Sequence, residues 1–357
     1  MPNKNNIVFV ADFVYYRQMP VKVCNDLITS IRDNSKLYNI TIFWTDEDPT
    51  MVQSKIHALS PELIIIFEIN SFSLTTKNFG FVLDMATPVY IFLDDTYYIN
   101  RSTSTCEYVQ QTDGLIFWYK NKKAVRSYQR IFPDKTITNI SSRFVNTRTF
   151  CDRKLEKKYD ILLYGSRIFK YEYKREKYDA IQDYISEYEK YHNVVVDENT
   201  KIDFYPLRVK MLDILEKYSS RYRIKIVSEA CYNSHLCNEE LSTLINQSYM
   251  TIACSSIADV LLHKYLEISA SNSVILGDIP SDYKELFEGN VIEINSFMQE
   301  EVILDTIDNA LANKEKLLEM SQNLHDRVHA EHNLECASED FDNVISGLID
   351  EVGNELE

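Results

Sequence analysis

The stretch HKYLEISASNSVILGDIP, which runs from His263 to Pro280, carries the signal that decides the fold. Its first half has the apolar spacing of a helix, with a single acid, Glu267, in the last turns. Its second half holds the short apolar run of a strand, Val274–Leu276, and the polar residues between the two predict the end of the helix. A helix followed at once by a buried strand is typical of α/β proteins with a parallel sheet.

The same alternation of helix and strand extends over the rest of the chain. Apolar, β-branched runs alternate with amphipathic segments through the first half, and a second series starts at Asp160, after the polar residues 146–158. The sequence therefore predicts two Rossmann-like, doubly wound domains, residues 1–150 and 151–335, that face each other across a cleft. Residues 168–203 are predicted to be a helical insertion in the second domain, and residues 336–357 a C-terminal helix.

The composition excludes several classes of protein. The chain of 357 residues has a formal net charge of −16, so it lacks the basic surface that nucleic acids require. No apolar run approaches the roughly 20 residues of a membrane span, and the N-terminus lacks the pattern of a signal peptide. The 7 cysteines are scattered without metal-ligand spacing, as expected in a reducing compartment. We therefore expect a cytoplasmic protein that has no transmembrane segment and binds no nucleic acid.

The few glycines narrow the chemistry further. The chain has only 7, with neither G-x-G-x-x-G after a strand nor a P-loop, which argues against the usual dehydrogenases and ATPases. Gly165 ends the strand-like YDILLYGSR, where backbone without a side chain can approach an anion. Arg208 lies in the first helical turn of YPLRVKMLDIL, where its charge and the helix dipole both favour a phosphate. Each residue also has a structural interpretation, as an ordinary turn glycine and a surface arginine.

Two acids lie eight positions apart around the quoted stretch: Asp259 precedes it, and Glu267 lies within its helical part. On one unbroken helix Asp259 and Glu267 lie roughly 12 Å apart, so they are expected to contact opposite ends of an extended ligand. Lys264 lies one turn before Glu267, which allows an exposed helix ion pair of little energetic consequence. The alternative is that Glu267 accepts hydrogen bonds from a vicinal diol such as a ribose, while Lys264 faces a diphosphate. The spacing alone is compatible with both interpretations.

The segment LLHKYLEISASNSVILGDIPSDYKELFEGNVIEI, residues 261–294, resembles the C-terminal half of two-domain GT-B glycosyltransferases of the group 1 superfamily, most closely the CgeB-like, spore-maturation branch. The shared pattern is Lys/Arg-x-x-Glu, a small-residue segment, an apolar strand, a short acidic loop and Phe-x-x-Gly/Asn. The resemblance covers roughly residues 155–340, with KKYDILLYGS and YPLR in matching order upstream, and it implies a C-terminal helix that packs near the linker. Two positions depart from the pattern: Asp259 stands where the family has glutamate, and Asn272 where it has a glycine after the helix. Asparagine tolerates the left-handed backbone expected there.

By that resemblance the second domain binds a nucleotide-sugar donor, such as a UDP- or GDP-sugar, and needs neither a metal ion nor another cofactor. The residues expected around the donor are Gly165, Ser166, Arg208 and Lys264 at the diphosphate, Glu267 at the ribose, and Ser255, Ser256, Asp259 and His235 along the pocket. In the family the first acid of the Glu-x7-Glu pattern contacts the transferred sugar, and Asp259 departs from the pattern at this position. For His235, in CYNSHLC, the alternative is an ordinary surface histidine, which the sequence pattern favours.

The acceptor side carries three candidate bases. Asp94 and Asp95 end the strand-like YIFLDDTYY, and Asp12 follows the first predicted strand. Adjacent residues of a strand point to opposite faces, so only one of Asp94 and Asp95 is expected to face the cleft. Each acid has the alternative role of capping a turn. The expected function is thus a metal-independent glycosyltransferase; the alternatives are a nucleotide-sugar epimerase with the same donor site and a non-catalytic binding or partner protein.

Overall fold

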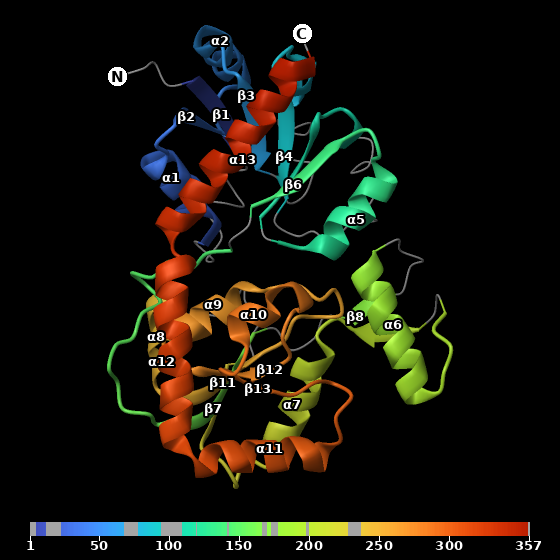
Figure 1. Ribbon diagram of the computed structural model, residues 1–357, viewed down its shortest axis with the longest axis vertical. Helices are drawn as coiled ribbons and strands as arrows, with labels where there is room; N and C mark the ends of the chain where they lie inside the picture. Colours follow the sequence, from blue (N-terminus) through green and yellow to red (C-terminus); the bar gives the residue numbers. More distant parts are fainter. Residues whose placement is uncertain are drawn as a thin grey trace. The chain divides into compact units, whose positions relative to one another are not determined.

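The structure, a computed structural model, describes residues 5–11, 23–67, 78–93, 109–118, 120–140, 143–165, 170–172, 178–197, 200–227 and 237–355. The chain forms two compact units. The first joins Met1–Arg143 to Leu334–Glu357, and the second comprises Phe144–Asn333. Each unit contains its own parallel sheet with helices packed against it (Figure 1).

The first unit is built on a six-stranded parallel sheet with the order β2-β1-β3-β4-β5-β6. Its strands are β1 (Asn5–Ala11), β2 (Tyr38–Trp44), β3 (Leu63–Phe67), β4 (Val89–Leu93), β5 (Gly114–Phe117) and β6 (Thr136–Asn139). The central strand β3 is apolar and buried at every residue. This is the pattern of a strand covered on both faces, which explains why the short runs in the sequence carry almost no polar residues.

The helices of the first unit come from both ends of the chain. They are α1 (Val23–Asn34), α2 (Pro49–Leu59), the 3₁₀ helix η2 (Gly80–Asp84), α5 (Lys122–Ile131) and α13 (Leu334–Glu355). α13 lies beside α1 (Figure 1), and its Asp342 carboxylate accepts hydrogen bonds from Ser35 Oγ at 2.7 Å and from the Lys36 amide at 2.8 Å. The ring of Phe341 on α13 is fully buried, 5.4 Å from the ring of Phe9 in β1. The C-terminal helix therefore contributes to the core of the first unit.

The second unit has a five-stranded parallel sheet with the order β10-β7-β11-β12-β13. Its strands are β7 (Tyr159–Tyr164), β10 (Ile224–Val227), β11 (Ser248–Ala253), β12 (Val274–Gly277) and β13 (Val291–Glu293). Because all the pairs are parallel, the carboxyl ends of β7, β11 and β12 lie next to one another at one edge of the sheet. The loops that leave these strands start at Gly165, Cys254 and Asp278. Ligands of doubly wound sheets bind at this kind of edge.

The helices of the second unit surround this sheet. They are α6 (Asp179–His192), α7 (Pro206–Lys217), α8 (Asn238–Asn246), α9 (His263–Ala270), the 3₁₀ helix η3 (Ser281–Tyr283), α10 (Lys284–Phe287), α11 (Glu300–Ala312) and α12 (Lys314–Glu331). α12 packs beside α9, where His325 Nδ1 lies 2.8 Å from the Ala270 carbonyl oxygen. The region 168–203 holds α6 between two short antiparallel strands, β8 (Lys170–Glu172) and β9 (Lys201–Asp203).

α9 shows how the quoted stretch of sequence folds. Asn272, just beyond the helix, has φ +55, so the predicted left-handed position is confirmed. The helix begins only at His263, and Asp259 lies in the preceding loop with φ +52. The single-helix geometry expected for Asp259 and Glu267 is therefore wrong. The chain turns first, because the Val260 amide donates a hydrogen bond of 2.9 Å to the Ser255 carbonyl.

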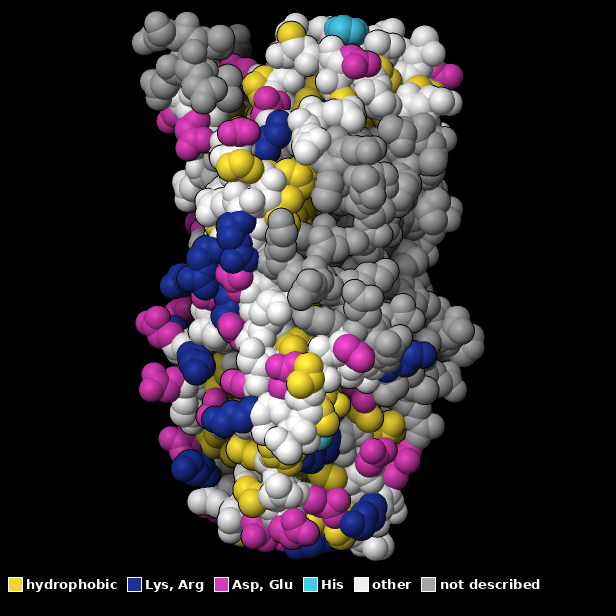
Figure 2. All heavy atoms as spheres, turned by 90° about the vertical axis from the view of Figure 1, so that its right-hand side faces the viewer, with side chains coloured by type: hydrophobic (Ala, Val, Ile, Leu, Met, Phe, Trp, Pro, Cys, Tyr) yellow, Lys and Arg dark blue, Asp and Glu magenta, His cyan; other side chains and the backbone are white. Residues whose placement is uncertain are grey.

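The exposed surface follows the composition. The chain has 54 acidic and 38 basic residues, and acidic and basic side chains lie interspersed over the described part of the face drawn in Figure 2. None of the helices that the structure describes combines the length and the apolar composition of a membrane span.

Candidate functional site

The exit of strand β7 is the centre of the candidate site. β7 ends at Tyr164, and the amide of Gly165 donates a hydrogen bond of 3.1 Å to the Val227 carbonyl. Gly165 has φ +119, a conformation that residues with a side chain rarely adopt. A Cβ at this position would collide with the Lys264 ammonium and lie 3.3 Å from Nη1 of Arg208. Bare backbone therefore faces two cations at this point.

Arg208 reaches the strand exit from the first turn of α7, which begins with Pro206. Its side chain is buried, and its guanidinium lies 3.9 Å from the centre of the Tyr205 ring. Its charge also acts on the thiol of Cys254, the residue that follows β11. Burial raises the pKa of this thiol, while the charges of Arg208 and Lys264 act in the opposite direction. A buried cation at the start of a helix is a favourable environment for an anion.

Lys264 and Glu267, one turn apart on α9, both contact Tyr164. The Lys264 ammonium donates to the Tyr164 carbonyl and lies 4.0 Å from the centre of the ring. Glu267 is only 9% exposed, and its Oε2 accepts a hydrogen bond of 2.9 Å from the Tyr164 hydroxyl. An exposed ion pair does not describe a carboxylate buried to this degree. Tyr164 thus joins both side chains to the strand exit.

The loops after β11 and β12 hold each other through two carboxylates. Asp278, directly after β12, accepts hydrogen bonds on Oδ1 from the Ser255 amide and the Tyr265 hydroxyl, both at 2.7 Å. Asp259, in the loop after β11, accepts from the Ser281 amide at 3.0 Å and from the Ser281 hydroxyl. Burial raises the pKa of Asp278 to about 6, against the lowering effect of the hydrogen bonds from Tyr265 and Ser255. These reciprocal contacts fix both loops at the carboxyl edge of the sheet.

The described donor-side candidates gather at this edge of the second sheet. They are Gly165, Arg208, Ser255, Ser256, Asp259, Lys264 and Glu267. Ser166 and His235, with the acceptor-side candidates Asp12, Asp94 and Asp95, lie outside the described residues. Within the described ranges, no group of three or more His, Cys, Asp or Glu side chains is placed to hold a metal ion.

Three residues of the site were not predicted from the sequence: Tyr164, Tyr205 and Asp278. Asp278 had a usable signal, an acid directly after the buried strand Val274–Gly277, at the edge where ligands bind. The two tyrosines had none. Their contacts depend on α7 and α9 both meeting the end of β7, which no local sequence pattern encodes.

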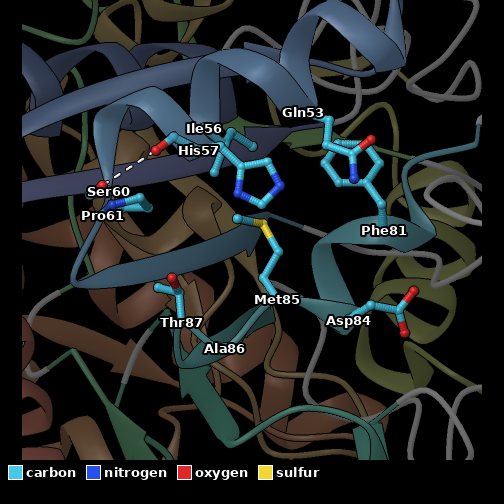
Figure 3. A pocket seen from close by; sticks show the side chains of 10 residues that line it. All are labelled: Gln53, Ile56, His57, Ser60, Pro61, Phe81, Asp84, Met85, Ala86 and Thr87. Carbon is cyan, nitrogen blue, oxygen red and sulfur yellow. Dashed lines mark hydrogen bonds between the residues drawn. The ribbon is translucent and has the colours of Figure 1, made fainter.

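A separate hollow of about 410 Å³ lies in the first unit. It is lined by the C-terminal half of α2 and by residues 81–87, and Figure 3 shows His57 and Met85 facing each other across it. Ser60 immediately precedes the approach to β3, and Thr87 the approach to β4, so the hollow lies at the amino ends of these strands. This is the edge opposite to the one at which such sheets bind ligands, so the hollow is not the candidate site.

Part of the second half of the chain matches a known protein family. Residues 208–341 match the family described as Glycosyl transferase-like. This segment contains Arg208, the loops after β11 and β12, and the whole of α9. None of the curated proteins matches the chain.

Solved structures match over nearly the whole chain. Sucrose-phosphate synthase from Thermosynechococcus elongatus is 10% identical, with a TM-score of 0.56 over 97% of this chain and 99% of its own. Anabaena Alr3699/HepE in complex with UDP and glucose is 11% identical, with a TM-score of 0.55 over 96% of this chain and all of its own. An alpha-glucosyltransferase in complex with UDP-glucose and DNA containing an abasic site is 11% identical, with a TM-score of 0.58 over 96% of this chain and all of its own. The chain therefore has the GT-B fold of glycosyltransferases, with a glycosyl transferase-like segment at residues 208–341.

Proposed function

We propose that the protein is a glycosyltransferase that moves a sugar from a nucleotide-sugar donor to an acceptor. One observation carries the proposal: Lys264 and Arg208 converge on Gly165, with Glu267 buried beside them. A nucleoside diphosphate suits this arrangement, because its phosphates favour cations and bare backbone while its ribose offers a diol. The fold and the glycosyl transferase-like segment support the same assignment.

A UDP-sugar is the first donor to consider, with a GDP-sugar as the alternative. Alr3699/HepE and the alpha-glucosyltransferase were solved with UDP or UDP-glucose, and both share the fold of this chain. The CgeB-like subtype rests on the pattern in residues 261–294. The acceptor-side bases Asp12, Asp94 and Asp95, the donor-side residue His235 and the cytoplasmic location stay predictions from the sequence.

The proposed chemistry centres on the leaving diphosphate. Negative charge grows on it as the bond to the sugar breaks, so Lys264 and Arg208 stabilise the transition state more than the bound donor. Glu267 contacts the ribose, which does not change during the reaction, and therefore contributes mainly to donor affinity. Two side-chain cations supply positive charge at the diphosphate, which is why we propose transfer without a metal ion.

Isothermal titration with UDP and with GDP tests the proposal. The wild type is expected to bind at least one of them, and Lys264→Ala and Arg208→Ala to weaken that binding by about 10- to 100-fold through the loss of a charge-assisted contact. Lys217→Ala is the matched control, because this lysine has a side chain that is 60% exposed and pairs with Glu300 on α11. It should bind as the wild type does. Equal affinities in the wild type and all three variants would refute the site.

Incubation with UDP-glucose separates the alternatives. A transferase releases UDP only when a suitable acceptor takes the sugar, or when water slowly acts as the acceptor. An epimerase of the same fold converts the donor to its epimer without an acceptor. A non-catalytic binding protein retains nucleotide affinity and converts no donor under either condition.

A further inference from the structure

Tyr164 occupies a position between the two functional side chains of α9. It is the last residue of β7 and is 7% exposed. Its carbonyl accepts from the Lys264 ammonium, its ring lies beneath that ammonium, and its hydroxyl donates to Glu267. One residue thus contacts the lysine expected at the diphosphate and the glutamate expected at the ribose through different atoms.

Tyr164 gives each of the two charged side chains a contact of its own. A lysine and a glutamate one turn apart on a helix ordinarily attract each other. Here the Tyr164 carbonyl draws Lys264 toward Gly165, while the Tyr164 hydroxyl, at the far end of the side chain, holds Oε2 of Glu267. The two charged groups are directed to separate places along the length of one tyrosine.

The hydroxyl also fixes the orientation of the Glu267 carboxylate. A carboxylate has two oxygens with about four acceptor positions, and a donor held on one oxygen restricts the rotation of the group. The vicinal diol of a ribose needs a carboxylate held in one orientation to accept from both hydroxyls. A freely rotating carboxylate would bind the diol less tightly, because part of the binding free energy would offset the entropic cost of ordering the side chain.

We propose that Tyr164 is a positioning residue that makes this site select ribonucleotide donors over 2′-deoxyribonucleotide donors. The proposal rests on the proposed function, and it narrows the donor class to ribonucleoside diphosphate sugars, excluding dTDP-sugars. A site built to hydrogen bond a hydroxyl discriminates strongly against the analogue that lacks it. Tyr164 contributes by holding the acceptor, Glu267, in place without itself contacting the sugar that is transferred.

Titration of Tyr164→Phe with UDP, 2′-deoxy-UDP, GDP and 2′-deoxy-GDP tests this. The phenylalanine keeps the ring beneath Lys264 and the backbone carbonyl, and removes only the hydroxyl. The wild type should bind the ribonucleotide at least about tenfold more tightly than its 2′-deoxy analogue, as expected for a hydrogen bond to a charged group. In Tyr164→Phe the affinity for the ribonucleotide should fall by about tenfold, while the affinity for the 2′-deoxy analogue should change little. The ratio of the two affinities then approaches one.

Tyr222→Phe is the matched control. The Tyr222 hydroxyl also donates a hydrogen bond of 2.9 Å to a carboxylate, that of Asp308. Tyr222 lies just before the amino end of β10, whereas Gly165 lies at the carboxyl edge of the sheet. This variant should keep both affinities and their ratio. If Tyr164→Phe merely disturbed the local structure, both affinities would fall together and their ratio would stay as in the wild type.

Three results would overturn the proposal. If Tyr164→Phe keeps the wild-type ratio of ribonucleotide to 2′-deoxynucleotide affinity, the hydroxyl has no role in selection, although the nucleotide site itself stands. A wild type that binds UDP and 2′-deoxy-UDP equally removes the ribose contact of Glu267, while the diphosphate site stands. A wild type that binds none of the four nucleotides refutes the proposed function itself, and this proposal with it.

Discussion

Replacing Gly165 by alanine tests the geometry of the strand exit directly. The backbone has φ +119 there, and a side chain in such a conformation costs about 1–3 kcal/mol. The added Cβ would also collide with the Lys264 ammonium, which ends a flexible chain and can move away at little cost. We therefore expect the free energy of unfolding to fall by about 1–3 kcal/mol because of the backbone, and nucleotide affinity to fall by about tenfold because of the displaced cation.

Gly289→Ala separates these two effects. Gly289 also has a positive φ, +74, but a Cβ there would have no atom within 4 Å. Its replacement should lower the free energy of unfolding by about 1–2 kcal/mol and leave nucleotide affinity unchanged. Urea unfolding of both variants gives the stabilities, and isothermal titration with UDP or GDP, whichever binds, gives the affinities.

A double variant makes the reasoning refutable. In a Lys264→Ala background no ammonium is present for the new Cβ to displace, so Gly165→Ala should lower the stability as before but reduce nucleotide affinity less than it does in the wild type. If Gly165→Ala binds nucleotide as tightly as Gly289→Ala does, the strand exit is not where the diphosphate lies. If it weakens binding equally with and without Lys264, the effect does not pass through this cation.

Three further outcomes are expected. Lys264→Ala should lower kcat more than Glu267→Gln does, whereas Glu267→Gln should mainly raise KM for the donor. Steady-state kinetics with a UDP-sugar measures both constants, and the reverse order would contradict the assigned roles. Burial raises the pKa of Asp278 from 3.8 to about 6, so the folded protein retains this proton over that interval and its stability falls as pH rises through it. Asp278→Asn should therefore gain up to about 3 kcal/mol relative to the wild type between pH 4 and pH 7 in urea unfolding, and a constant difference would show that Asp278 is not the titrating group. Phe341→Ala should destabilise the first unit by about 3–5 kcal/mol, seen as a lower Tm, because it empties the space beside Phe9; a loss below about 1 kcal/mol would mean that α13 is not part of that core.

The sequence predicted the fold well because buried parallel strands leave a local signature. Runs such as Leu63–Phe67 contain no polar residue, and they alternate with amphipathic segments at the spacing of βα units. The left-handed position at Asn272 was predictable for a similar reason, since asparagine tolerates that backbone and the family pattern has glycine there. In each case the signal lies within a few neighbouring residues.

The details of the candidate site depended on contacts between distant segments, and these were predicted less well. Gly165, Arg208 and Glu267 were singled out by their places at a strand end, a helix start and the last turns of a helix. The contact of Asp259 with Ser281 was missed, because Ser281 lies beyond the following strand. The role of Tyr164 was missed as well, since it follows only from the packing of α9 against the end of β7. Local spacing cannot indicate which segments become neighbours across a sheet.

The reciprocal contacts of Asp259 and Asp278 have a consequence for motion. Each loop carries the carboxylate that binds the other, so neither loop can open without breaking contacts of both. Local opening of this edge should then be cooperative, so hydrogen exchange of the Ser255 and Ser281 amides should give the same free energy of opening under conditions where exchange reports the opening equilibrium. Any donor that requires one of these loops to shift would have to move the pair together, which makes the edge behave as a single rigid wall of the site.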